Sequence, residues 1–358
     1  MVSLRFGRAG RPRCPHGITL GPRADSASYS DNSLAAAKAL QGCVNVPSII
    51  ANTFSNAQRV VATAHKTVSS TGLTTSSYRY QPTPSKRGFS EFVNDYYDDE
   101  GWWALALIRA WDLTHQHTYL DMAERIFADM HNGTDGTCGG GVWWSKERAY
   151  KNAIANELYL SVAAGLANRI VGKKAQYTQL AKASWTWFRS SGMINEHNLV
   201  NDGLMIHADG KCANNGQNTW SYNQGVVLGG LVELAKATDD ASYLNPAVAI
   251  AKAALALLSD GNGIIREVNE CEPDCGSDGS QFRGIFVRNL RYLHLAVPHE
   301  AFRTAIVKNA DSIWAHNRNG KNQLGIKWTG PPELGEGPNA STHSSAMDVI
   351  VAALAVSS

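Results

Sequence analysis

The chain has 358 residues, of which 44% are hydrophobic and 18% are charged. This apolar fraction excludes a disordered chain, and the length suits one large domain or two smaller ones. Lys and Arg number 33 against 31 for Asp and Glu, so the net charge of +2 gives no electrostatic reason to expect nucleic acid or a membrane surface as a partner. No apolar run approaches the roughly 18 residues that a membrane-spanning helix needs.

The beginning of the chain differs in composition from the rest. Residues 1–24 are rich in Arg, Gly and Pro and lack the apolar segment of a signal peptide. We therefore expect an irregular leader outside the fold. Residues 25–358 are expected to form a single domain, because no Pro/Ser-rich linker divides them.

Cysteines and glycosylation signals bear on the compartment. The chain has six cysteines and two sequons, which begin at Asn132 and Asn339, and both features favour the secretory route. Cys271 and Cys275 have no second such pair or paired histidine nearby, so a small disulfide loop is favoured over half of a zinc site. We expect an extracellular protein, secreted or in a cell wall.

Helical patterns dominate the chain after the leader. Two helices are expected near the start, over Asn32–Leu40 and Ser48–His65. Trp102–Leu113 is apolar on nearly every side, as a helix buried all round must be, whereas the next helix has an apolar stripe on one face only. The same alternation continues, with buried helices predicted over Ile154–Ala167, Gly225–Ala235, Gly284–Val297 and Ser341–Val356.

This repetition predicts the fold. The buried helices recur at intervals of about 50–70 residues, and an outer helix follows each of the first four. Roughly eleven or twelve such helices, without a convincing alternating strand, predict an all-α protein with an (α/α)6 barrel, a toroid of helical hairpins. An open solenoid is the competing shape, but solenoids usually show tighter periods and a consensus repeat.

Polar, Gly-rich stretches precede the buried helices, over Asn94–Trp103, Cys138–Asn152, Val200–Gln224 and Cys271–Gly284. The N-terminal ends of parallel inner helices meet at one mouth of a toroid, so these stretches are expected to line one cavity. Loops of this kind on a rigid scaffold usually carry function. The 10 Trp and 12 Tyr of the chain suit a sugar-binding wall or ordinary packing equally well.

Two adjacent acids, Asp98 and Asp99, stand out at the start of a buried helix. Glycoside hydrolysis needs two carboxyl groups with unlike protonation, one ionised beside the anomeric carbon and one protonated at the leaving oxygen. The helix dipole favours the anionic form of one acid, and its charge raises the pKa of the other. The alternative is ordinary N-capping, since acids are common in any first helical turn.

Other site chemistries lack their motifs. There is no HExxH, GxSxG or phosphate-cradling GxxxxGK sequence. A calcium loop around Asp95 and Asp98 lacks the spaced ladder of acids and amides that calcium requires. We therefore expect neither a metal nor a cofactor.

The chain resembles glycoside hydrolase family 76, the endo-α-1,6-mannanases of bacteria and fungi, most closely the fungal members. The resemblance extends from about Ser28 to Ala353. It rests on five blocks in order: YYDDEGWWALALIRAWDLT (96–114), GGGVWWSKERAYKNAIANELYL (139–160), VNDGL (200–204), WSYNQGVVLGGL (220–231) and QFRGIFVRNL (281–290).

The resemblance implies an (α/α)6 barrel that cleaves α-1,6-mannosidic bonds with retention of configuration. It implies that Asp98 is the nucleophile, that Asp99 is the general acid/base and that Asp202 contacts the substrate. Further residues expected to line the sugar groove are Tyr97, Trp103, Trp143, Trp144, Asn152, Asn223, Gln224 and Arg283. For each of Trp143 and Trp144, packing beneath the barrel is an equally good interpretation.

The expected function is therefore endo-hydrolysis of α-1,6-mannan or mannooligosaccharides by a monomer. One alternative is a cell-wall transglycosidase that transfers mannan-bearing glycans to wall glucan. Such fungal family members are often lipid-anchored, and the ending DVIVAALAVSS reads better as a last barrel helix than as an anchor signal. The other alternative is a mannan-binding protein without turnover, for which two intact adjacent acids are not needed.

Overall fold

The structure is a computed structural model that describes residues 46–357, except 59–63, 71, 73 and 79–91. The leader and the helix predicted over Asn32–Leu40 lie outside the described residues. The described part contains ten α-helices, three short 3-10 helices and four short strands.

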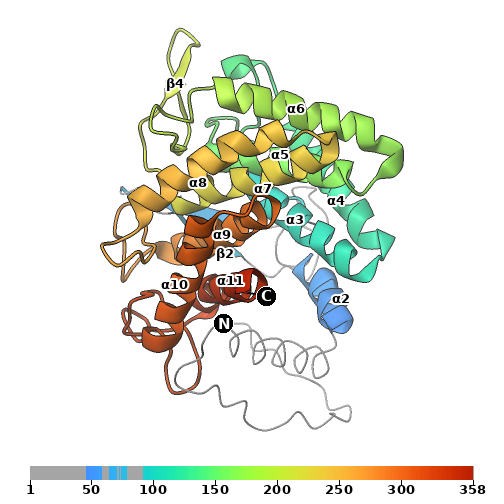
Figure 1. Cartoon of the computed structure of the whole chain (residues 1–358). Coiled ribbons are helices and arrows are strands. Elements are labelled where there is room, and N and C mark those ends of the chain that lie inside the picture. The colour runs from blue at the N-terminus through green and yellow to red at the C-terminus, as the bar shows by residue number, and fades with distance from the viewer. Residues whose placement is uncertain (1–45, 59–63, 71, 73, 79–91, 358) are drawn as a thin grey trace.

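Long helices of two kinds alternate along the chain. The inner helices are α3 (Tyr97–Thr114), α5 (Ala153–Ala167), α7 (Ser221–Thr238), α9 (Gly276–Ala296) and α11 (Ala340–Ser357). The outer helices are α4 (His117–Asn132), α6 (Lys174–Ser190), α8 (Leu244–Leu258) and α10 (Glu300–His316), and α2 (Val46–Ala57) precedes them all. Consecutive inner helices contact one another in chain order, and each outer helix packs on the inner helix before it (Figure 1). The predicted (α/α)6 barrel is confirmed.

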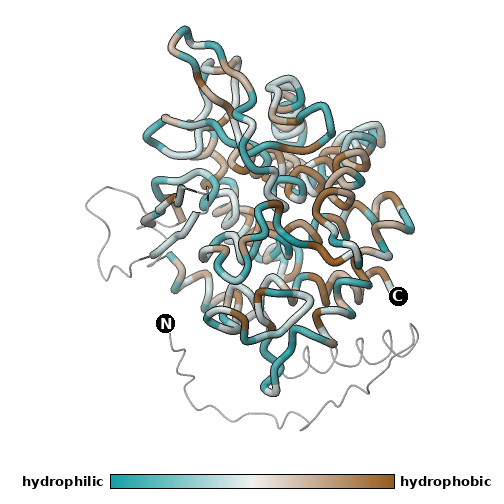
Figure 2. Tube along the Cα trace, turned by 90° about the vertical axis from the view of Figure 1, so that its left-hand side faces the viewer, coloured by the Kyte–Doolittle hydropathy of each residue, from teal (hydrophilic) through white to brown (hydrophobic). Residues whose placement is uncertain are grey.

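The difference between inner and outer helices follows from their residues. Every residue of α5 is buried, because neighbours surround this helix on all sides. In α4 only a stripe that includes Tyr119, Ile126 and Met130 is buried, and polar residues occupy the other face. Figure 2 shows the hydrophobic residues concentrated along the helices and the hydrophilic ones in the loops between them.

The predicted helix Ser48–His65 is wrong at its C-terminal end. The helix α2 ends at Ala57, and β1 (Ala64–Val68) pairs antiparallel with β2 (Thr74–Tyr78). Threonine and valine favour strands, and the pairing satisfies backbone groups that a helix would otherwise have to satisfy. A second hairpin joins β3 (Leu204–Ile206) to β4 (Cys212–Asn214).

The helix α9 begins at Gly276, eight residues before the predicted Gly284. Asp278 lies in its first turn, where the helix dipole stabilises a carboxylate. Ser280 donates a hydrogen bond of 2.8 Å to the carbonyl of Ser277, which closes this turn. The two additional turns extend α9 toward the strand β2, which it contacts.

One apolar segment exceeds what the sequence led us to expect. Among the described residues, Ala241–Leu258 is the stretch that is long and apolar enough to cross a membrane by length and composition. It comprises the 3-10 helix η3 (Ala241–Tyr243) and α8, which contact α7. The buried residues of α8 form a stripe on one face, as in the other outer helices.

Candidate active site

One large cavity opens where the inner helices begin, with a volume of about 1280 Å³. All four polar stretches contribute to its lining, as predicted, and the hairpin β1–β2 and the helix α2 contribute as well. The lining includes Lys66, Asp98, Asp99, Trp102, Trp103, Trp144, Tyr150, Asn152, Asp202, Trp220, Tyr222, Asp278 and Phe282.

The first turn of α3 carries the two acids into this cavity. The residue before the helix, Tyr96, has extended backbone geometry and makes no side-chain cap. Its neighbour Tyr97 donates its N–H to the carbonyl of Trp144 at 2.9 Å, which ties the helix start to the next loop. Asp98 and Asp99 are only 8% and 7% exposed, so neither is a solvated capping residue.

Four hydrogen bonds hold the paired carboxylates. The ammonium of Lys66 bridges them, at 2.9 Å from Oδ2 of Asp98 and 2.8 Å from Oδ1 of Asp99. The indole of Trp144 donates to Oδ2 of Asp98 at 3.1 Å, and the amide of Asn94 donates to Oδ2 of Asp99 at 3.0 Å. Oδ1 of Asp98 is buried and has no hydrogen-bond donor among the described residues.

The surroundings shift the pKa values of Asp99 and Lys66. Burial and the negative charge of Asp98 raise the pKa of Asp99 to about 6, although Lys66 and Asn94 act in the opposite direction. Burial works against the charge of Lys66, but the two carboxylates raise its pKa above the ordinary value. The site therefore keeps a permanent cation beside a carboxyl group that takes up a proton in mildly acidic solution.

A third acid, Asp202, lies in the loop after α6 and contacts the start of α5. Its carbonyl accepts the N–H of Ala153 at 2.7 Å. Its Oδ2 accepts a hydrogen bond of 2.6 Å from the hydroxyl of Tyr150, which in turn accepts one of 2.8 Å from the amide of Asn215. Burial raises the pKa of Asp202, whereas the hydrogen bond from Tyr150 works to lower it.

The predicted site residues divide into two groups. Those that line the cavity are Asp98, Asp99, Trp103, Trp144, Asn152 and Asp202. Those that are absent from its lining are Tyr97, Trp143, Asn223, Gln224 and Arg283. The second group lies close by in the fold, and all five side chains are buried.

Trp143 and Gln224 support the loops around the cavity. The indole of Trp143 donates to Oδ2 of Asp135 at 2.7 Å. The amide of Gln224 accepts the N–H of Val200 and donates to its carbonyl, both at 2.8 Å, in the manner of a neighbouring strand.

Arg283 belongs to a smaller cavity of about 280 Å³ on the other side of α9. Its guanidinium lies 2.7 Å from Oε1 of Glu272 and stacks over the ring of Trp328 at 4.5 Å. Tyr97 lies beneath the ammonium of Lys146, which is 5.4 Å from the ring centroid.

Several lining residues had no signal of their own in the sequence. Lys66 lies one residue beyond the predicted helix Ser48–His65, and only the folded hairpin brings it to the acids. Tyr150 is one of many polar residues in its loop. Tyr222 and Phe282 stack in parallel with ring centroids 3.8 Å apart, although 60 residues separate them in the chain.

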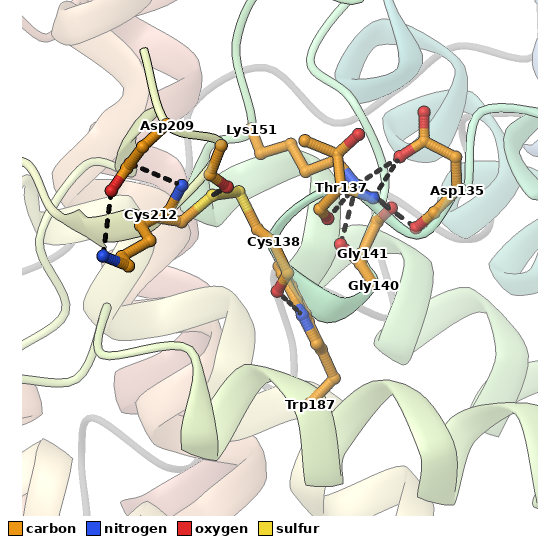
Figure 3. Close-up of a disulfide and its surroundings, with 11 residues drawn as sticks. Asp135, Thr137, Cys138, Gly140, Gly141, Lys151, Trp187, Asp209 and Cys212 are labelled. Atoms are coloured by element: carbon orange, nitrogen blue, oxygen red, sulfur yellow. Dashed lines mark hydrogen bonds and ion pairs between the residues drawn. A yellow bond between two sulfur atoms is a disulfide. The ribbon is translucent and has the colours of Figure 1, made fainter. Parts of the chain in front are cut away.

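A buried cation and a disulfide brace the loop that presents Trp144 and Tyr150 (Figure 3). The ammonium of Lys151 contacts Oδ1 of Asp135 at 2.9 Å and the carbonyls of Thr137 and Gly140 at 2.8 and 2.7 Å. Two disulfides are present in the described part of the chain. Cys138–Cys212 lies beside the groups that surround Lys151, and Cys271–Cys275 confirms the predicted disulfide loop. The described residues contain no cluster of His, Cys, Asp and Glu that could hold a metal ion.

Comparison with known proteins gives a consistent picture. A family model described as glycosyl hydrolase family 76 matches residues 49–358. The mannan endo-1,6-alpha-mannosidase DCW1 of Candida albicans is 28% identical over 218 residues, which is 56% of this chain and 47% of that protein. A putative mannan endo-1,6-alpha-mannosidase of Schizosaccharomyces pombe is 29% identical over 217 residues, 56% of this chain and 48% of that protein. The chain thus spans about half the length of these curated relatives.

Solved structures share the fold. One is an inactive variant of the α-1,6-mannanase GH76A of Salegentibacter sp. HEL1_6 in complex with α-1,6-mannotriose, in which two consecutive aspartates are replaced by asparagine. It is 24% identical to this chain, with a TM-score of 0.66, and the match covers 74% of this chain and 78% of that one.

Proposed function

The chain belongs to glycosyl hydrolase family 76, and from this membership and the geometry of the cavity we propose that it is a retaining, endo-acting hydrolase of α-1,6-mannosidic bonds in mannan backbones. The observation that carries the proposal is the pair Asp98–Asp99, buried side by side on one cavity wall. The names of the curated relatives support the substrate class.

The spacing of the acids supports retention rather than inversion. The two oxygens bound to Lys66 lie within 2.9 Å of one nitrogen. They are therefore less than ~6 Å apart, which suits the ~5–5.5 Å of retaining enzymes better than the ~6.5–9.5 Å of inverting ones.

The proposed mechanism has two steps. Asp98 attacks the anomeric carbon, and its Oδ1, which has no donor among the described residues, has a lone pair available for the new bond. Asp99 gives its proton to the departing O6 of the next mannose, so the glycosidic bond breaks as the ester bond to Asp98 forms. Asp99, now ionised, takes a proton from water, which attacks the anomeric carbon and releases Asp98.

The cavity suits an oligosaccharide. Its volume of about 1280 Å³ exceeds the ~300–1,000 Å³ of typical small-molecule pockets. Trp102, Trp103, Trp144 and the stacked pair Tyr222–Phe282 offer the apolar faces on which sugar rings pack. We assign substrate contact to the lining residues, and to Trp143, Asn223, Gln224, Tyr97 and Arg283 the task of holding the walls.

Incubation with linear α-1,6-mannan tests the function. We expect shorter reducing oligosaccharides, with the α-anomer formed first as proton NMR would detect. Asp98→Asn and Asp99→Asn should each reduce their release by at least ~10³-fold, because covalent and acid catalysis are lost. Asp209→Asn is the matched control, since Asp209 is exposed and, among the described residues, ion-pairs with Lys211 at the surface. Full activity of either Asp98 or Asp99 variant would refute the proposal.

An extracellular location is part of the proposal. Two disulfides, Cys138–Cys212 and Cys271–Cys275, are typical of an oxidising compartment. The sequon residues Asn132 and Asn339 are both exposed, so an attached glycan would not disturb the core. Expression through a eukaryotic secretory pathway should yield protein whose mass falls after glycosidase treatment, and unmodified protein would contradict this part of the proposal.

A further inference from the structure

Lys66 makes the closest contacts to both acids of the site. Among the described residues, Lys66 is the cationic side chain that forms ion pairs with Asp98 and Asp99, and this side chain is 3% exposed. Its ammonium also lies 4.7 Å from the ring centroid of Tyr96 and 5.7 Å from that of Trp144. Carboxylates and aromatic faces therefore surround the charge, and little water reaches it.

The position of Lys66 is set from the opposite side of the cavity. Lys66 lies directly across the hairpin from Ser76. The N–H of Ser76 donates to the hydroxyl of Ser277 at 3.0 Å, and its own hydroxyl donates to Oδ2 of Asp278 at 2.7 Å. Both partners belong to the first turn of α9. The hairpin is therefore anchored to α9 on one side of the cavity, and from there it extends Lys66 to the acids on α3.

The charge of Lys66 decides which protonation state of the acids is neutral overall. Two carboxylates with one shared proton carry a charge of −1, and Lys66 cancels it. Without the lysine, the neutral state would be the doubly protonated pair, which has no nucleophile. Burial strongly favours a cluster without net charge, so the lysine favours the singly protonated pair.

We propose that Lys66 is a positioning residue of the carboxylate pair, whose ammonium makes the state with one ionised and one protonated acid the favoured state of the buried site. This inference rests on the proposed retaining mechanism, which needs that state. The pKa of about 6 for Asp99 agrees with a pair that holds one proton in mildly acidic solution.

Other charged and titratable groups face the cluster, and none of them ion-pairs with the two acids among the described residues. From α3 comes Glu100, which pairs with Lys146 at 2.8 Å, and from α9 come Asp278 and Arg288 on the cavity wall. The remaining groups are Asp95, Tyr96, Glu147, Tyr150, Asp202 and Tyr222.

The pH dependence of mannan hydrolysis tests this role. In Lys66→Met the pair should take up its second proton at higher pH, because a neighbouring cation lowers a carboxyl pKa by about 1–3 units. Both limbs of the kcat profile should move up by at least about one pH unit, with kcat reduced at acidic pH and KM changed less. Lys66→Arg should retain the wild-type pH profile of kcat, since arginine keeps the positive charge.

Lys146→Met is the matched control, because Lys146 pairs with Glu100 and Asp129 and does not line the cavity. It should lower stability and leave the profile in place. Lys66→Gln provides a second neutral variant if Lys66→Met does not fold.

Titration of the acids by carbon-13 NMR of labelled aspartate separates this inference from the proposed function, because it needs no activity. The midpoints of the pair should rise in Lys66→Met or Lys66→Gln and stay close to wild type in Lys66→Arg and Lys146→Met. Unchanged midpoints in the neutral variants would overturn the role of Lys66, even in an active mannanase. A wild-type chain that fails to cleave mannan would instead refute the proposed function.

Discussion

The hydroxyl of Tyr150 donates a 2.6 Å hydrogen bond to Asp202 over a position that only glycine fits. A Cβ atom at Gly203 would lie 2.4 Å from that hydroxyl oxygen and 2.7 Å from the carbonyl oxygen of Lys151. The close approach joins the loop before α5 to the loop after α6, so two of the four cavity-lining stretches are held as one surface.

Replacement of Tyr150 by phenylalanine removes this link without changing the shape of the side chain. Burial and the charge of Asp202 raise the pKa of Tyr150, so its phenol stays protonated and donates at any working pH. We expect kcat/KM on α-1,6-mannan to fall about 10- to 100-fold, in line with the ~1.5–3 kcal/mol of a hydrogen bond to a charged group.

The control for this variant is Tyr159→Phe. Tyr159 is also buried and its hydroxyl also has a partner, Nδ1 of His131 at 2.6 Å, but it does not line the cavity. It should lower the melting temperature and leave kcat/KM within about threefold of wild type. Equal losses of kcat/KM in the two variants would mean that the effect is one of stability alone.

The neighbours Trp143 and Trp144 should respond differently to replacement by phenylalanine. Trp144 donates to Asp98, so Trp144→Phe should reduce kcat about tenfold or more and change stability little. Trp143 donates to Oδ2 of Asp135 and packs in the core, so Trp143→Phe should lower the free energy of unfolding by about 1–3 kcal/mol. Steady-state kinetics and urea unfolding of both variants check this, and the reverse pattern would contradict the structure.

The raised pKa of Asp99 predicts a pH-dependent cost to stability. Its folded-state pKa of about 6 lies above the ordinary 3.8, so the folded protein binds this proton more tightly than the unfolded chain does. The stabilising contribution is complete below pH ~4 and is lost as the pH rises through about 6. Asp99→Asn removes this titration, so wild type should lose stability relative to the variant between these pH values.

Urea unfolding of both proteins from pH 4 to pH 7 measures the difference. Buried acids that do not contact the pair titrate alike in the two proteins and cancel. A difference that does not change with pH would show that Asp99 has no raised pKa in the folded protein.

The two disulfides should differ in their contribution to stability. Cys138–Cys212 closes a loop of 74 residues, whereas Cys271–Cys275 closes one of four. Because a disulfide stabilises mainly by restricting the unfolded chain, the Cys138→Ser/Cys212→Ser variant should lose about 2–4 kcal/mol. The Cys271→Ser/Cys275→Ser variant serves as the control and should lose clearly less. Thermal unfolding under non-reducing conditions compares them, and equal losses would contradict the chain-entropy argument.

The periodicity of apolar residues along the chain predicts most of the fold. Helices such as α5 that are apolar on all sides can only be buried, and one-sided helices such as α4 can only cover them, so the barrel followed from local patterns. The hairpin β1–β2 escaped prediction because its apolar content is low and its pairing depends on partners that the local sequence does not specify.

The acids Asp98 and Asp99 and the stretches that line the cavity were recognisable, but the direction of individual side chains was not. Trp143 and Trp144 are identical in type and adjacent in the chain, and an extended backbone turns successive side chains to opposite sides. The tertiary contacts decide between the two sides. Trp143 donates to Asp135 and lies in the wall, whereas Trp144 donates to Asp98 and enters the cavity.

By itself the sequence determined an all-helical barrel with a polar mouth and two neighbouring acids at that mouth, because these properties depend on residues close together in the chain. The tertiary structure decided that Lys66 neutralises one of those acids and that Tyr150 holds Asp202. Those contacts join residues 32 and 52 positions apart, and electrostatic interactions depend on distance in space, which is known only once the chain has folded.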